Sequence, residues 1–149
     1  MTDWDQFAEG LAQHLATLPT GAVVKIIESD ESAEVPRYAQ FLQSDTKLFA
    51  EVVGDDWLDE DKGAGEAGER LLAEAGWHQP DDAHSGNWWF DSAWPIDSAA
   101  YQRLASMVVT GLRDALRVTD LADFYYEAWN GNAGNRKLDL PLLGIPPLD

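Results

Sequence analysis

Two histidines and two aspartates gather in one short polar stretch of the sequence. His78, Asp81, Asp82 and His84 lie within seven residues, and imidazole nitrogens and carboxylate oxygens are groups that bind zinc in proteins. A metal-dependent enzyme centred on the His78–His84 loop is therefore one hypothesis for the function. However, no helical i, i+4 spacing or strand fixes the geometry of these side chains, and polar surface loops collect the same residue types. We expect a solvated loop that holds no metal and no other cofactor.

Other signs of catalysis are missing from the sequence. The acidic runs at Asp55–Asp56 and Asp59–Asp61 lack the alternating ligands, the turn glycine and the closing glutamate of a calcium loop. The chain has no phosphate-binding G-x-x-x-x-G-K-[ST] motif, no dinucleotide G-x-G-x-x-G motif and no G-x-S-x-G motif. It also has no cysteine, which excludes disulfides and thiolate chemistry. These features favour a protein that is not an enzyme.

The composition limits the possible partners. The chain has 149 residues, enough for one domain, and its 27 acidic and 10 basic residues give a net charge of −17. Phosphates and anionic lipid heads would repel such a surface, so we expect no binding to nucleic acid or to membranes. The beginning of the sequence lacks the basic and then apolar pattern of a signal peptide, and we expect a cytoplasmic protein.

Hydrophobic periodicity predicts three helices and five strands in the order α-β-β-β-α-β-α-β. The predicted helices cover residues 4–18, 66–75 and 98–116, and the predicted strands cover residues 22–27, 38–43, 47–53, 87–91 and 122–129. Asp97 is placed to cap the last helix, and Gly76 to end the second. The fold class is therefore α+β, with helices packed on a mostly antiparallel sheet of about five strands.

The last twenty residues differ in composition from the rest. Residues 1–129 form the predicted domain, whereas residues 130–149 read as a flexible Gly/Asn linker followed by an apolar, proline-rich tail. Leu138 to Leu148 is too apolar for an ordinary solvated terminus. We expect this tail to lie extended on its own domain or on a second copy, where it covers an apolar surface until a client displaces it.

Aromatic residues are the most informative feature of the composition. Trp88 and Trp89 are adjacent in a predicted strand and must face opposite sides of it, so one of them points away from the main core. Either a helix or the tail covers that second face, or the aromatic side chains there serve protein recognition. The candidate partner-binding residues are Trp88, Trp89, Trp94, Tyr125 and Trp129.

Several local phrases resemble a known family. The phrases are Leu18–Gly21, Tyr38–Phe41, Leu48–Val53, Leu71–His78 and Leu112–Leu116. They resemble the TY-Chap domains of actinobacterial proteins, which are similar to YbjN-like proteins and to the type III secretion chaperone-like fold, and the resemblance covers roughly residues 4–129. It implies a compact α+β domain without catalytic apparatus. Secretion chaperones are small, acidic and usually dimeric proteins that hold an unfolded stretch of a client, so the resemblance also implies a protein partner and a possible homodimer.

The leading hypothesis is a non-enzymatic, chaperone-like module that holds an extended client or partner segment. Exposed aromatic side chains would supply the affinity, and the acidic rim would prefer basic clients. One alternative is a sensory or regulatory domain that binds a small ligand in an aromatic pocket. The other is the metal-dependent enzyme that uses the His78–His84 loop.

Overall fold

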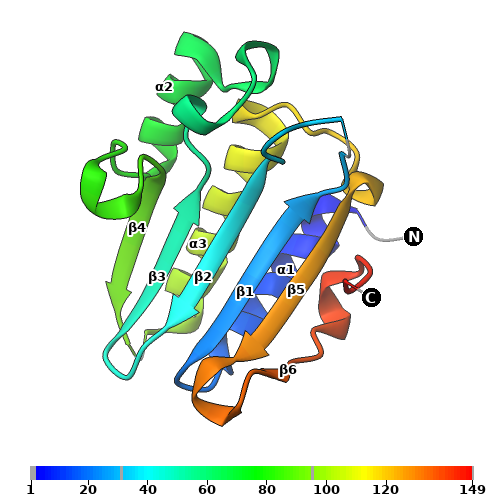
Figure 1. Cartoon of the computed structure of the whole chain (residues 1–149). Helices are drawn as coiled ribbons and strands as arrows, with labels where there is room; N and C mark the ends of the chain where they lie inside the picture. Colours follow the sequence, from blue (N-terminus) through cyan, green and yellow to red (C-terminus); the bar gives the residue numbers. More distant parts are fainter. Residues whose placement is uncertain (1–2, 31, 95, 149) are drawn as a thin grey trace.

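One antiparallel sheet with helices against a single face organises the chain (Figure 1). The computed structural model describes residues 3–30, 32–94 and 96–148. Its sheet has six strands in the order β4-β3-β2-β1-β5-β6. The helices are α1 (Trp4–Ala16), α2 (Gly65–Ala75) and α3 (Ser98–Val109), and the strands are β1 (Ala22–Glu28), β2 (Tyr38–Gln43), β3 (Lys47–Val52), β4 (Trp88–Ala93), β5 (Phe124–Asn130) and β6 (Arg136–Lys137).

The helices begin and end where the capping residues place them. Asp3 caps α1, accepting a hydrogen bond from the backbone N–H of Gln6, whose side chain accepts one in return from Asp3 N–H. Asp97 caps α3 through the N–H of Ala100 at 2.8 Å. After α2, Gly76 takes a left-handed conformation with φ 118°, which glycine adopts without steric cost.

The core lies between the helices and the inner face of the sheet. Helices α1 and α3 pack against each other, with α1 behind β1 and β5 and α3 behind β2 and β3 (Figure 1). Helix α2 packs against the end of α3, where residues 110–115 widen into a π-helical turn. Alternate residues of β1 point into this core, and the last of them is Glu28, which is buried. Arg37 neutralises that carboxylate, with its Nε 2.9 Å from Glu28 Oε1, so the charge is not left unpaired.

The predicted order of elements, the α+β class and the antiparallel sheet are confirmed. The sequence did not predict β6, because two residues are too few for an alternating pattern to show. The third helix was predicted to run to residue 116, and its last turn is π-helical rather than α-helical. Among the described residues, no helix has both the length and the apolar character needed to cross a bilayer.

The C-terminal segment packs on its own domain, along the outer side of β5 and against α1 (Figure 1). Residues 130–135, which we expected to be a flexible linker, form a turn in which Asn130 accepts hydrogen bonds from Asn132 N–H and Asn135 N–H. The tail then buries three apolar side chains in the core, at 4%, 0% and 7% exposure: Leu140, Leu143 and Ile145. The tail thus docks on its own domain in this structure of one chain, and docking on a second copy stays a prediction.

Candidate functional site

The second face of the sheet carries a partly apolar surface. Helices α1 and α3 lie behind the sheet in the view of Figure 1, and no helix in the described part of the chain covers the side toward the viewer. We call this side the open face. Its residues are the intermediate or exposed positions of strands β1, β2, β3 and β5, which alternate with buried positions.

Strand register aligns the side chains of the open face in rows. One row is apolar and crosses four strands from Trp129 through Val23 and Leu42 to Phe49. Leu42 is 44% exposed at the centre of this row. Single exposed apolar residues are ordinary on protein surfaces, but neighbouring strands lie only about 4.8 Å apart, so this row is continuous.

The next row along the strands is polar. It runs from Glu127 through Lys25, Gln40 and Glu51 to Trp89. The Lys25 ammonium lies 5.7 Å from the ring centre of Trp129 in the apolar row, a cation–π distance. Glu127 and Glu51, which belong to this polar row, place negative charge directly beside the apolar row.

A groove of about 400 Å³ lies over these two rows where they cross β1, β2 and β3. Its lining includes Val23, Leu42 and Phe49 from the apolar row, Glu51 from the polar row, and His84 from the loop before β4. The groove is thus apolar at its floor and acidic at one side. A side chain with an apolar stem and a basic end matches that chemistry.

The polar loop that suggested a metal site packs on the open face instead. His84 stacks on Trp89 with ring centroids 4.1 Å apart and planes 5° apart, and His78 lies 4.4 Å from the same ring. Asp81 Oδ1 lies 2.7 Å from His84 Nδ1, and this hydrogen bond lowers the pKa of the Asp81 carboxyl. Asp82 does not share these contacts. In the described residues, no three His, Cys, Asp or Glu side chains are grouped to hold a metal ion.

The five predicted partner-binding residues divide between the two sides of the sheet. Trp88 is only 1% exposed and belongs to the core, which leaves it no accessible surface for a partner. Trp94 packs against the core just after β4. Trp89, Tyr125 and Trp129 lie on the open face, where β4 and β5 hold them on opposite sides of three intervening strands.

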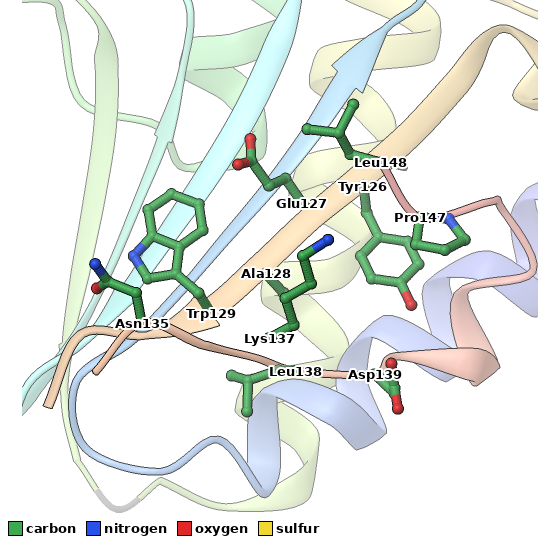
Figure 2. Close-up of a pocket in the computed structure, with 10 residues that line it drawn as sticks. All are labelled: Tyr126, Glu127, Ala128, Trp129, Asn135, Lys137, Leu138, Asp139, Pro147 and Leu148. Carbon is green, nitrogen blue, oxygen red and sulfur yellow. The ribbon is translucent and has the colours of Figure 1, made fainter. Parts of the chain in front are cut away.

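A second hollow, of about 410 Å³, lies where the open face meets the outer edge of β5. Figure 2 shows the side chain of Lys137 between Trp129 and Pro147, with Leu148 at the far end. Glu127 and Asp139 also line this hollow. Trp129 therefore belongs both to the apolar row and to this pocket.

The sequence prediction missed the centre of the apolar row. Val23, Leu42 and Phe49 were read only as members of predicted strands. The signal was nonetheless present, because Phe41-Leu42 and Leu48-Phe49 are adjacent apolar pairs within strands, as Trp88-Trp89 is. Each such pair must direct one side chain away from the inner face.

A protein-family model matches residues 1–130 of the chain, and its description is T3SS (YopN, CesT) and YbjN peptide-binding chaperone 3, or TY-Chap3. The chain belongs to the TY-Chap3 family. The predicted resemblance to TY-Chap and YbjN-like domains is thereby confirmed, and the family description indicates a peptide-binding, chaperone-like protein whose partner is a polypeptide. The match ends at the last residue of β5, so β6 and the apolar tail lie beyond it. No curated protein and no solved structure gives a significant match.

Proposed function

We propose that this TY-Chap3 protein holds an extended segment of a client polypeptide on the open face of its sheet, without catalysing a reaction. The apolar row of Trp129, Val23, Leu42 and Phe49 carries this proposal. Membership of a family described as peptide-binding chaperones supports it. Trp129 provides an aromatic anchor within that row, and Tyr125 provides a second one opposite Ile27, beyond the polar row. Interfaces are enriched in such residues.

The charge of the molecule defines the preferred client. Glu127 and Glu51 flank the apolar row, and the whole chain carries a net charge of −17. An extended peptide exposes alternate side chains on its two sides. A client that alternates apolar residues with lysine or arginine would therefore place the former on the apolar row and the latter near the glutamates.

Binding of a labelled synthetic peptide tests the proposal. The probe is a fluorescein-labelled peptide of alternating leucine and lysine, and the measurement is fluorescence anisotropy on the full chain. Replacing Leu42 and Phe49 together by serine should weaken binding about tenfold or more, because the peptide loses apolar contact worth about 0.8 kcal/mol per CH₂ group.

Leu71 provides the matched control for this experiment. It is 38% exposed, close to the 44% of Leu42, but it lies on α2. Leu71→Ser should leave the affinity unchanged. Equal affinity of the wild type and the Leu42→Ser, Phe49→Ser variant would contradict the proposal.

One observation favours a second candidate, a small-ligand regulatory domain. The hollow beside Trp129 has a volume of about 410 Å³, within the range of roughly 300–1,000 Å³ that small-molecule sites occupy. A ligand that binds there would raise the melting temperature, since it stabilises only the folded state. A thermal-shift screen in which Trp129→Ala removes the shift would favour this candidate.

The possible homodimer stays a prediction, which light scattering of the purified chain tests.

A further inference from the structure

The last residues of the chain occupy the outer edge of β5 in the manner of an added strand. The N–H of Tyr126 donates to the carbonyl of Pro146 at 2.9 Å, and the N–H of Leu148 donates to the carbonyl of Tyr126 at 2.7 Å. Tyr126 and Pro147 thus form a parallel bridge. An extended chain that pairs with an exposed strand edge is a recurring mode of peptide recognition.

This terminal contact is weak compared with the attachment of the tail that precedes it. Pro146, Pro147 and Leu148 are all exposed, and Leu148 retains 44% of its surface. The two backbone hydrogen bonds of Tyr126 are what holds these residues to β5. By contrast, Ile145 is 7% exposed and remains fixed in the core. Residues 146–148 can therefore leave the edge of β5 while the rest of the tail stays in place.

Two hollows flank the terminal segment. The pocket of about 410 Å³ beside Trp129 is lined on one side by Pro147 and Leu148 (Figure 2). Another hollow, of about 600 Å³, is lined by Trp4, Leu121 and residues 144–146. The terminal segment lines both of them, so its departure would connect them along the edge of β5.

The surroundings of the two hollows are acidic. Asp3 and Asp120 line one of them, and Glu127 and Asp139 line the other, whereas Lys137 is the single basic side chain among the lining residues that the structure describes. No ion pair involves any of the four carboxylates within the described part of the chain. Asp3 and Asp120 accept hydrogen bonds from the backbone N–H groups of Gln6 and Ala122, and these bonds leave their charges unneutralised. Basic residues that flank a bound strand would therefore meet carboxylates that carry no cationic partner.

We infer that the edge of β5 around Tyr126, short of Ala128, whose carbonyl already accepts the N–H of Leu138, is a strand-addition site for a client segment that is extended, apolar and flanked by lysine or arginine. The chain's own residues 146–148 occupy this site when no client is bound. This inference rests on the proposed function. It adds to the open face a second site, which binds the backbone of the client by hydrogen bonds. A strand paired with this part of β5 would place side chains beside Tyr125 and Glu127, whereas β6 already pairs with Trp129. One client can thus bind the edge and continue onto the open face.

The test uses the full chain and two substitutions at one exposed position. Leu148→Pro removes the N–H that donates to Tyr126, whereas Leu148→Ala keeps it and removes most of the side chain. The probe is a fluorescein-labelled peptide that repeats residues 143–148 with two lysines added at each end. Leu148→Pro should increase the affinity for this probe about three- to tenfold, because one competing hydrogen bond is lost. Leu148→Ala should change it less than about twofold.

A modified probe checks that the bound segment pairs through its backbone. Methylation of the backbone nitrogen at the leucine that corresponds to Leu148 should abolish the gain, because that nitrogen can no longer donate to Tyr126. Equal binding of the methylated and unmethylated probes, or equal affinity of the wild type and Leu148→Pro, would overturn the strand-addition site. If Leu42→Ser, Phe49→Ser still weakens binding of the leucine–lysine peptide in that case, the open-face function stands alone. No binding of either peptide would reject both.

Discussion

The ring of His14 accepts a hydrogen bond from the backbone of Leu142 and so joins the first helix to the C-terminal tail. His14 Nε2 lies 3.0 Å from Leu142 N. An imidazole nitrogen accepts a hydrogen bond only when it carries no proton, so this contact requires neutral His14 with its proton on Nδ1. Partial burial also lowers the pKa of His14 from its ordinary value of 6.5, because desolvation disfavours the charged ring.

This contact predicts that acid weakens the fold through His14. The unfolded chain protonates near the ordinary pKa of 6.5, whereas the folded chain protonates at a lower pH. The stability that His14 contributes is therefore complete above pH 6.5, the pKa in the unfolded chain. It declines as the pH falls from 6.5 toward the lower pKa of the folded chain. Urea denaturation from about pH 8 to about pH 5 measures this slope.

The variant His14→Gln isolates the contribution of this one residue. Glutamine keeps an acceptor at the end of the side chain but does not titrate. The difference in unfolding free energy between wild type and variant should shrink as the pH falls below 6.5. A difference that does not change with pH would show that protonation of His14 does not lower the stability of the fold.

A glycine on α1 provides a second test of the tail's attachment. A Cβ atom at Gly10 would lie 2.0 Å from the carbonyl oxygen of Leu142. Alanine favours a helix by about 0.8–1 kcal/mol over glycine, so the helix alone predicts that Gly10→Ala stabilises the protein. The clash reverses the sign, and we expect a net loss of about 1–3 kcal/mol in chemical denaturation.

Gly131→Ala is the control for that substitution. A Cβ atom there would meet only the carbonyl oxygen of Gly21 at 3.5 Å, an ordinary contact. Its unfolding free energy should stay within about 0.5 kcal/mol of the wild type. If Gly10→Ala proves as stable as this control, the tail does not pack on α1 in solution.

Removal of residues 138–149 should expose the core rather than merely open a binding surface. Leu140, Leu143 and Ile145 are all buried, and burial of three such side chains contributes roughly 5–9 kcal/mol. The net stability of a domain is only about 5–15 kcal/mol. The truncated chain should therefore bind a hydrophobic dye and lose its cooperative melting transition, whereas the full chain keeps that transition. A truncated chain that melts like the full chain would show that the tail is not part of the core.

The sequence predicted the fold well where a periodic pattern was long enough to read. Residues 38–43 were predicted as a strand with the same bounds that β2 has in the structure, and Asp97 was predicted to cap the helix that it caps. The packed tail was harder to predict, because its buried residues follow no period of 2 or 3.6. Their burial depends on the absence of a side chain at Gly10, which is remote in the sequence.

The candidate site was predictable only in part, for a related reason. Alternation within a strand showed that one of Trp88 and Trp89 must face outward, but not which one. The register of β3 with β4 decides it, since Trp89 lies opposite Glu51 on the open face. The contact of His84 with Trp89 likewise depends on how the loop folds back, which local sequence does not specify.

Substitutions of two predicted site residues should separate structure from function. Trp88 is 1% exposed in the core, so Trp88→Ala should lower the unfolding free energy by about 3–5 kcal/mol.

Trp129 is partly exposed on the open face, and its loss removes one cation–π contact with Lys25, worth about 0.5–1 kcal/mol. Trp129→Ala should nevertheless weaken binding of the leucine–lysine peptide about fivefold or more, as the loss of an aromatic anchor does. Denaturation and anisotropy on both variants measure the two effects, and a Trp129→Ala protein that binds like the wild type would place the client elsewhere.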